Sequence, residues 1–209
     1  MSTSNGMRLL AISVGKAVPL FVAAVGTEAV VMSGIRKHPL STLLHPLSVA
    51  VRPLGLAGDE QADLSVHGGL DKAVYAYPAE HYAWWNERRR EARLPEAGKP
   101  LVPGAMGENL TLEGVLETDL WVGDLLRIGD VVLKVESPRQ PCYKLNAVMG
   151  YRHAIKHMVQ SGYSGIYLSV VIPGDLQAGA AVAIEPGPRD VSIESINTRQ
   201  RDGRQSQLF

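Results

Sequence analysis

Short apolar runs that stop at a glycine or a proline are the feature that most restricts how this chain can fold. Leu9–Val14 is followed by Gly15, and Gly165–Ile172 is followed by Pro173-Gly174. Glycine (21 residues) and proline (13) together form about one sixth of the 209 residues, above the roughly 12% of an average protein. Runs of this length suit strands and are too short for most helices. The chain therefore predicts a mainly β fold.

Further strands are predicted beside turns that contain glycine. Val22–Val31 is small and apolar and predicts one strand. Leu125–Ile128 and Val131–Glu136 alternate around Gly129-Asp130, which is typical of a tight hairpin turn. Strands at intervals of about ten residues predict a β-barrel or a β-sandwich.

Two segments carry helical patterns. Pro78–Arg93 begins with a proline, which suits the first position of a helix, and places Tyr82, Trp85 and Arg89 on one face. Tyr151–Val159 is the second segment. We expect both helices to pack outside the sheet.

The length of the chain suits one domain, which we place at residues 1–186. The remaining segment, 187–209, is polar and shows little apolar periodicity. We therefore expect it to be a mobile C-terminal tail.

Charge balance and cysteine count exclude several classes of protein. Twenty-one basic residues balance twenty-one acidic ones, so no global field favours nucleic acid or an anionic membrane as a partner. No apolar run reaches the roughly 18 residues of a membrane span, and Lys16 and Pro19 interrupt what would be a signal peptide. Cys142 is the only cysteine, which excludes an intramolecular disulfide and zinc sites that need two thiolates. We expect a cytoplasmic protein.

Common catalytic motifs are absent or incomplete. The chain contains neither a P-loop nor a nucleophile elbow. His153 and His157 lie four residues apart on a predicted helix, a spacing that suits a metal ion, but no third ligand is nearby. We therefore do not expect a metal site there.

Two glycine-rich segments carry an unusual density of polar side chains. The first, Gly55–Pro78, contains Asp59, Gln61, Asp63, His67, Gly68, Gly69, Asp71 and Lys72. Its glycines permit close approach of the backbone to a ligand, although a surface turn closed by Asx hydrogen bonds has the same composition. In the second, Pro103–Gly114, Glu108 and Asn109 form either an acceptor and donor pair in a cleft or a turn that enters a strand.

Cys142 lies in a third unusual segment. A single cysteine is usually a small buried hydrophobe. Here Pro138 and Pro141 predict a rigid turn after the hairpin, and Arg139 and Lys144 place two cations near the sulfur. Positive neighbours favour the thiolate, which attacks electrophiles and binds soft metals.

Together these segments resemble the MOSC domains, named for the C-terminal part of molybdenum cofactor sulfurases, and within them the stand-alone bacterial YiiM-like branch. The resemblance runs from about Met7 to Pro186 and is carried by GDEQADLSVHGGLDKAVYAYPAEHY, GENLTLEG, VGDLLRIGDVVLKV and PRQPCYKL. It implies a closed or nearly closed β-barrel with a few peripheral α-helices. It also implies a molybdenum cofactor and the reduction of N-hydroxylated compounds, such as hydroxylaminopurine, to amines.

The resemblance assigns roles to individual residues. Cys142 matches the cysteine that binds molybdenum, and Arg139 and Lys144 match flanking cations, which we assign to the phosphate or dithiolene end of the cofactor. His67 is the expected proton donor. The other residues expected to bind the cofactor are Asp59, Gly68, Gly69, Asp71, Lys72, Glu108 and Asn109.

Four positions depart from the family pattern. Met106 stands where an aromatic residue is common, Ile166 where tryptophan is common, Ser169 where arginine is common, and Ala180 where the pattern has aspartate. These differences bear on substrate preference more than on cofactor binding. The resemblance also implies that the chain ends where longer members continue into a small helical domain, so that either an electron-transfer or dimer contact is missing or the function does not need one.

The leading interpretation is an oxidoreductase that uses a molybdenum cofactor, with a small N-hydroxylated substrate, an electron donor and a homodimer as expected partners. A second is a module that carries the cofactor, or sulfur on Cys142, without turnover. A third is a cysteine enzyme without molybdenum, which would need a base near Cys142 that the sequence does not display.

Overall fold

The computed structural model describes residues 6–24, 27–62 and 68–205. The strands are β1 (Arg8–Val14), β2 (Val18–Ala24), β3 (Thr27–Ser33), β4 (His38–Thr42), β5 (Val49–Arg52), β6 (Gly55–Leu56), β7 (Val74–Pro78), β8 (Leu110–Glu113), β9 (Leu125–Ile128), β10 (Val131–Pro138), β11 (Ile166–Ile172), β12 (Gly174–Leu176) and β13 (Val182–Glu185). The α-helices are α1 (His81–Glu91), α2 (Tyr143–Met149), α3 (Ala154–Ser161) and α4 (Ile193–Gln205), and short 3-10 turns are η1 (Leu70–Lys72) and η2 (Glu117–Asp119).

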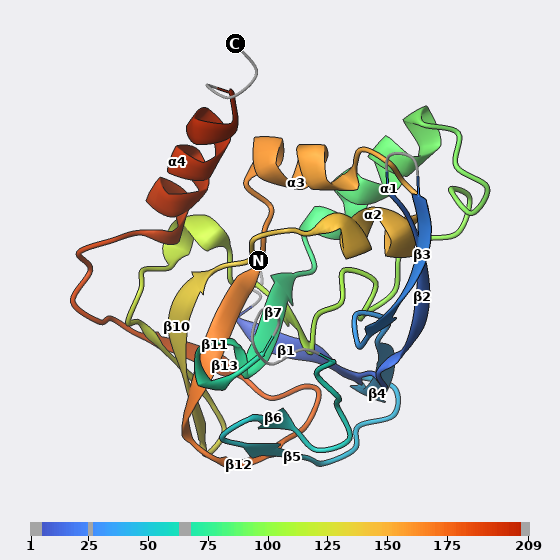
Figure 1. Cartoon of the computed structure of the whole chain (residues 1–209). Helices are drawn as coiled ribbons and strands as arrows, with labels where there is room; N and C mark the ends of the chain where they lie inside the picture. The colour runs from blue at the N-terminus through green and yellow to red at the C-terminus, as the bar shows by residue number, and fades with distance from the viewer. Residues whose placement is uncertain (1–5, 25–26, 63–67, 206–209) are drawn as a thin grey trace, which may run out of the picture.

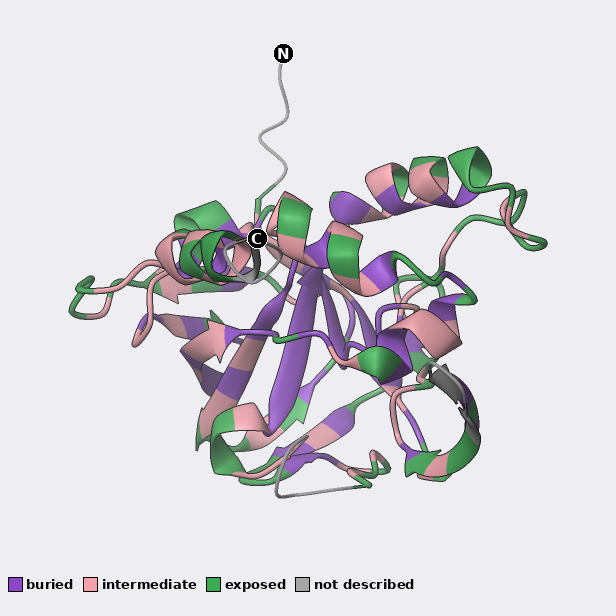
Figure 2. Ribbon diagram, turned by 45° about the horizontal axis from the view of Figure 1, so that its top comes forward, coloured by how far each residue is buried: buried purple, intermediate pink, exposed green. Residues whose placement is uncertain are grey.

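The centre of the molecule is an eight-stranded sheet in the order β13-β9-β10-β11-β7-β8-β1-β4. Its pairs are antiparallel except β7 and β8, which run parallel. Figure 1 shows the four helices at one end of this sheet and β5, β6 and β12 at the other. Buried residues are concentrated in the sheet strands, whereas the helices expose their outer faces (Figure 2). The predicted mainly β fold with peripheral helices is therefore confirmed.

The complete β-barrel expected from the sequence is not confirmed. No strand ladder in the described ranges joins β4 to β13, the two ends of the sheet. An isolated bridge pairs Arg8 with Ala181, and the N–H of Leu9 donates to the carbonyl oxygen of Ala180 at 2.9 Å. The start of β1 is thus linked to the segment before β13 by a few hydrogen bonds rather than by a continuous ladder.

The helices differ from their predicted positions. Pro78 is the last residue of β7 and not the first of a helix, because α1 begins three residues later. Trp85 and Arg89 are buried on the predicted face of α1. The sequence prediction missed α2, whose seven residues are too few to show a helical period. Within the described ranges, no helix has both the length and the apolar character needed to cross a membrane.

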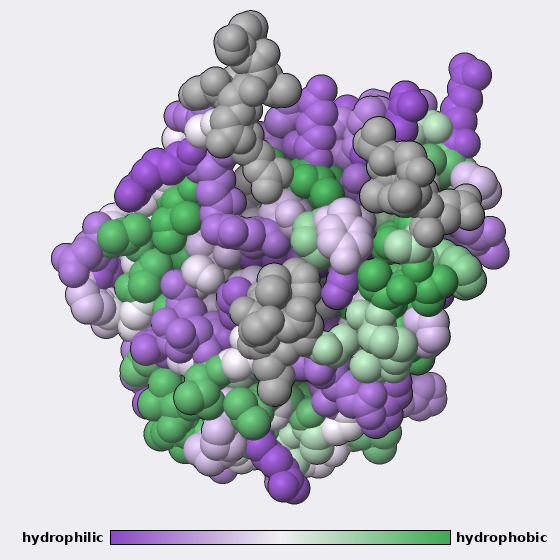
Figure 3. Space-filling model, in the orientation of Figure 1, coloured by the Kyte–Doolittle hydropathy of each residue, from purple (hydrophilic) through white to green (hydrophobic). Residues whose placement is uncertain are grey.

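The single strand predicted at Val22–Val31 is wrong, because this range is divided between β2 and β3 of a hairpin. Leu20 and Val22 are buried on the face of β2 that packs against α2. Phe21, which is 78% exposed, and Met32 lie on the outer face. On the face of the molecule in Figure 3, groups of hydrophobic residues are separated by hydrophilic ones.

The C-terminal segment, for which the composition predicts a mobile tail, contains α4. Ile193 is fully buried in the main hydrophobic core. Nδ2 of Asn197 donates to the carbonyl oxygen of Gly162 at 3.0 Å and to Oγ of Ser164 at 3.1 Å. Ile193 and Asn197, one helical turn apart, therefore anchor a helix that is mostly polar.

Candidate functional site

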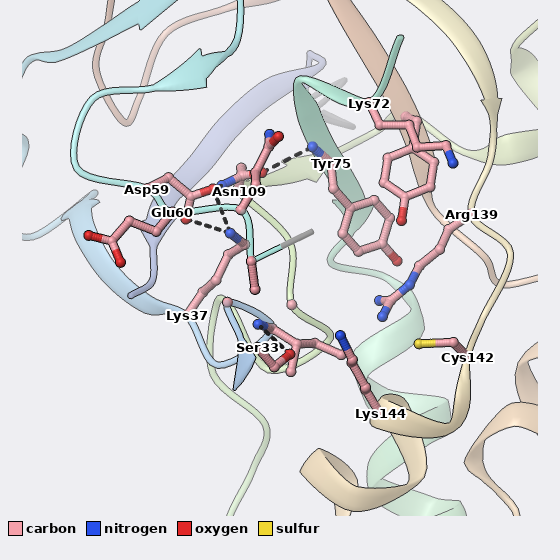
Figure 4. Close-up of a pocket in the computed structure, with 16 residues that line it drawn as sticks. Ser33, Lys37, Asp59, Glu60, Lys72, Tyr75, Asn109, Arg139, Cys142 and Lys144 are labelled. Atoms are coloured by element: carbon pink, nitrogen blue, oxygen red, sulfur yellow. Dashed lines mark hydrogen bonds and ion pairs between the residues drawn. The ribbon is translucent and has the colours of Figure 1, made fainter. Parts of the chain in front are cut away.

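An open cavity lies between the β2–β3 hairpin, the segment that follows β6, and the loop between β10 and α2 (Figure 4). It encloses about 620 Å³, including the space at its mouth. Six residues predicted from the sequence to form the site line its wall: Asp59, Lys72, Asn109, Arg139, Cys142 and Lys144. The fold thus brings together residues from four separate parts of the chain.

Cys142 occupies the N-cap position of α2 and is half-buried. Its backbone is extended, with φ of −114° and ψ of 171°, and Pro138 ends the preceding strand. Figure 4 shows Sγ directed into the cavity, on the same side as the guanidinium of Arg139 and Nζ of Lys144. The thiol therefore lies at the cavity wall, at the start of α2, and not in a strand core.

Three cations surround the space in front of Cys142. Arg139 is buried, binds the carbonyl oxygen of Met106, and lies with Cζ 4.8 Å from the centre of the Tyr75 ring. Lys72 lies 5.9 Å from the centre of the Tyr167 ring. Nζ of Lys144 is 3.5 Å from the carbonyl oxygen of Met32. Burial raises the pKa of both Tyr75 and Tyr167, so the phenols are neutral and leave the cationic charge available to an anionic ligand.

Asp59 is paired with Lys37, a residue that the sequence analysis missed. Nζ of Lys37 lies 2.5 and 2.7 Å from the carboxylate oxygens of Asp59, and both side chains are almost fully buried. Burial lowers the pKa of Lys37, although the charge of Asp59 opposes this effect. A buried aspartate requires a partner. The sequence alone does not indicate which of its distant lysines provides it.

Glu108 and Asn109 are neighbours in the chain, but only Asn109 lines the cavity. Nδ2 of Asn109 donates to Asp59 at 2.9 Å, and its Oδ1 accepts the N–H of Tyr75 at 3.1 Å. Glu108 is fully buried and is not part of the cavity wall. Glu108, which the sequence analysis assigns to the cofactor site, therefore does not line this cavity.

Glu108 instead holds the loop that precedes β8. It is fully buried, and its carboxylate accepts the N–H groups of Gly104 at 2.7 Å and Met106 at 2.9 Å. The hydroxyl groups of Tyr82 and Thr111 also donate to it. Burial raises the pKa of Glu108, and these hydrogen bonds act in the opposite direction. Glu108 binds the N–H of Met106, and the carbonyl oxygen of Met106 accepts a hydrogen bond from Arg139. Glu108 therefore helps to position Arg139 beside Cys142.

Only some of the residues predicted to bind the cofactor in the glycine-rich segment line the cavity. Asp59 and Lys72 line it, whereas Gly68, Gly69 and Asp71 do not. Gly69 has φ of 90° and donates its N–H to Oε1 of Gln61 at 3.2 Å, so it shapes the turn before η1. His67 lies outside the described residues.

The four departures from the family pattern are not part of the cavity wall. Met106 and Ile166 are buried, and Oγ of Ser169 donates to Glu136 at 2.6 Å. Met106 reaches the site only through its backbone carbonyl. These side chains therefore do not form the surface that a ligand in this cavity would contact.

His153 and His157 have other partners than a metal ion. His153 accepts a hydrogen bond from Arg152 at 2.9 Å, and Nδ1 of His157 lies 3.2 Å from the hydroxyl of Tyr151. Among the residues that the structure describes, no three histidine, cysteine or acidic side chains are grouped to hold a metal. A metal bound by Cys142 would therefore need other ligands than a cluster of such side chains.

This chain matches one protein family and several curated proteins. The model of the MOSC domain family matches residues 63–183. The protein YiiM of Escherichia coli is 40% identical over 141 residues, which cover 68% of this chain and 61% of YiiM. YflK of Bacillus subtilis, an uncharacterized protein, is also 40% identical, over 67% of this chain and 60% of YflK. A Gibberella moniliformis protein named reductase is 35% identical over 64% of this chain and 23% of its own length. The chain spans about 60% of the length of the two bacterial relatives.

Solved structures with the same fold extend the match beyond the family model. YiiM from Geobacillus stearothermophilus superposes with a TM-score of 0.70 at 33% identity, over 95% of this chain and 85% of that one. YiiM from Escherichia coli gives a TM-score of 0.67 at 26% identity, over 91% and 76%. The similarity therefore includes β1 to β6, which lie before the matched family region.

Proposed function

Because the chain belongs to the MOSC domain family, we propose that it binds a molybdenum cofactor through Cys142 and reduces N-hydroxylated compounds to amines. The observation that carries the proposal is the position of Cys142 at the wall of an open cavity, beside the cations Arg139 and Lys144. The relatives named YiiM and the relative named reductase are consistent with this assignment.

The chemistry of the cavity fits such a cofactor. A thiolate is a soft ligand that suits a heavy transition metal. The pyranopterin part of the cofactor carries phosphate, which Arg139, Lys144 and Lys72 would hold through charge-assisted hydrogen bonds. No other side chain described near Cys142 is a soft metal ligand, so the protein would provide a single anchor for a metal whose remaining ligands come from the cofactor.

The residues at this site would have different roles. When bound, the cofactor supplies the two-electron chemistry that protein side chains lack. Cys142 would hold the metal, Arg139 and Lys144 would orient the anionic end, and the neutral rings of Tyr75 and Tyr167 would keep one wall free of opposing charge. The reaction also requires an electron donor. The cytoplasmic location and the homodimer stay predictions.

The proposal is tested by the molybdenum content of the purified full chain. We expect about one molybdenum per chain from a host that makes the cofactor, and none from a host that does not. Cys142→Ala should lose the metal, whereas Ser195→Ala, on α4 and outside the cavity wall, should retain it. Equal molybdenum in wild type and Cys142→Ala would contradict the proposal.

Turnover separates the reductase from a carrier of the cofactor. Loaded protein is mixed with hydroxylaminopurine and a chemically reduced dye as electron donor. We expect formation of the amine. Fully loaded protein that forms no amine would favour the carrier, in which Cys142 holds the cofactor or sulfur without reducing a substrate.

The charge of Arg139 should also increase the rate at which the Cys142 thiol is alkylated. In cofactor-free protein, Arg139→Leu should slow alkylation of Cys142 by iodoacetamide roughly tenfold at pH 7, because a neighbouring cation favours the reactive thiolate. Arg139→Lys keeps the charge and should have a smaller effect. Arg127→Leu, at an exposed ion pair with Glu185, is the control and should not change the rate. A rate unaffected by Arg139→Leu would mean that this cation does not activate the thiol.

A further inference from the structure

Lys37 carries an ammonium group that the cavity wall holds in a fixed place. Its side chain is 8% exposed, and Nζ lies 2.5 and 2.7 Å from the two carboxylate oxygens of Asp59. Lys37 and Asp59 both line the cavity, and Figure 4 shows them across it from Arg139 and Cys142. A molecule in the cavity would therefore lie between Lys37 and the thiol.

Asp59 is itself fixed, so the ion pair cannot rotate away from the cavity. The N–H of Gly15 donates to Oδ1 of Asp59 at 2.8 Å, and Nδ2 of Asn109 donates to Oδ2 at 2.9 Å. Asn109 is held in turn by the N–H of Tyr75 at 3.1 Å. This chain of hydrogen bonds connects Lys37 to the central strand β7.

The state of the ammonium suits it to proton donation. Lysine has three N–H donors, and in the described part of the chain the only acceptor bonded to Nζ of Lys37 is the Asp59 carboxylate. Burial lowers the pKa of Lys37, Arg139 acts in the same direction, and the charges of Asp59 and Glu108 oppose them. Lys37 therefore releases its proton more readily than an exposed lysine does.

We propose that Lys37 is a catalytic proton donor, which protonates the substrate nitrogen as the N–O bond breaks; this rests on the proposed function. The balanced reaction converts R–NHOH, two electrons and two protons into R–NH₂ and water. Lys37 supplies the proton to nitrogen. The solvent that reaches the open cavity supplies both the second proton, with which the hydroxyl group leaves as water, and the proton that restores Lys37. A bound molybdenum cofactor would supply the two electrons, and an external electron donor would replace them.

The other cations of the cavity suit this step less well. Arg139 does not lose its proton in proteins. Lys144 is two residues from Cys142 and belongs with the group that holds the cofactor. Lys72 lies over the ring of Tyr167. His67, the proton donor that the sequence predicts, lies outside the described residues, and its role stays a prediction.

The first experiment measures the proton on Lys37 directly, in cofactor-free full-length protein labelled with ¹⁵N at lysine Nζ. Lys37→Arg identifies the Lys37 signal, and Lys99→Arg identifies a reference lysine whose side chain is 79% exposed. We expect Lys37 to lose its proton at a lower pH than Lys99. Titration of Lys37 at the same or a higher pH would overturn the proposal.

The second experiment uses Lys37→Arg, which keeps the positive charge and can pair with Asp59 but cannot donate a proton at neutral pH. We expect unchanged molybdenum content and turnover of hydroxylaminopurine about 100-fold slower or worse at pH 7. Lys16→Arg, at an exposed ion pair with Glu60, is the matched control and should turn over normally.

The outcomes separate this proposal from the one it rests on. If wild type and Lys37→Arg turn over equally, Lys37 is not the proton donor and the proposed function stands. If loaded wild type forms no amine, both proposals fail. Loss of molybdenum from Lys37→Arg would show that Lys37 holds the cofactor instead, and it would also overturn the assignment as proton donor.

Discussion

Glu108→Gln is expected to lower the free energy of unfolding by about 3 kcal/mol, because one buried backbone N–H loses its acceptor and the remaining hydrogen bonds lose their charge assistance. Both carboxylate oxygens of Glu108 accept a backbone N–H, from Gly104 and from Met106. The amide NH₂ of glutamine must therefore face one of these donors. For a chain of this length, the melting temperature should fall by about 6–12 °C.

Glu113→Gln is the control for this prediction. Glu113 lies five residues further along the chain and pairs with Arg8 at 2.5 Å, but both side chains are partly exposed. Ion pairs of this kind contribute less than about 1 kcal/mol. Urea unfolding of both variants measures the difference. Similar losses of stability would show that the hydrogen bonds of Glu108 do not hold the loop.

Gly165→Ala is expected to cost about 3–5 kcal/mol, from a left-handed backbone and from overpacking. Gly165 has φ of 64°, and an added Cβ would lie 2.5 Å from the carbonyl oxygen of Ala76 and 2.7 Å from the ring of Tyr75. Neither neighbour can move freely, because Ala76 pairs with Ile166 in the sheet and Tyr75 donates its hydroxyl to Ser164 at 2.7 Å.

Gly129→Ala separates the two causes. Gly129 has φ of 58°, nearly the same backbone, but no atom lies within 4 Å of an added Cβ. This variant should cost only the roughly 1–2 kcal/mol of the left-handed conformation. Thermal unfolding of the two variants measures the contribution of the close packing beside Tyr75. Equal costs would show that the sheet accommodates the methyl group without strain.

The strands that end at glycine and proline could be predicted because those residues act locally. The hairpin at β9 and β10 has its turn residues in two adjacent positions, and the structure contains it as expected. The division of Val22–Val31 into two strands could not be predicted in the same way, since a run of small apolar residues has no alternation that marks a reversal. Short helices such as α2 could not be predicted either, because seven residues are too few to show a helical period.

The candidate site was predicted in part because its chemistry is local in the sequence around Cys142. Arg139 and Lys144 flank the cysteine in the chain and also in the structure. Which of Glu108 and Asn109 faces the ligand depends on the direction in which β8 enters the sheet, and this is decided by distant partners. The pairing of Lys37 with Asp59 joins residues 22 positions apart and has no sequence signal of its own.

The scattered origin of the cavity wall has a consequence for how a newly made chain acquires a cofactor. Ser33, Asp59, Asn109 and Cys142 meet only after the central sheet has brought distant segments together. Closing such long loops is slow, because the chain loses conformational entropy before the stabilising contacts form. We therefore expect half-synthesised or partly unfolded chains to have no affinity for the cofactor, and incorporation to follow release from the ribosome.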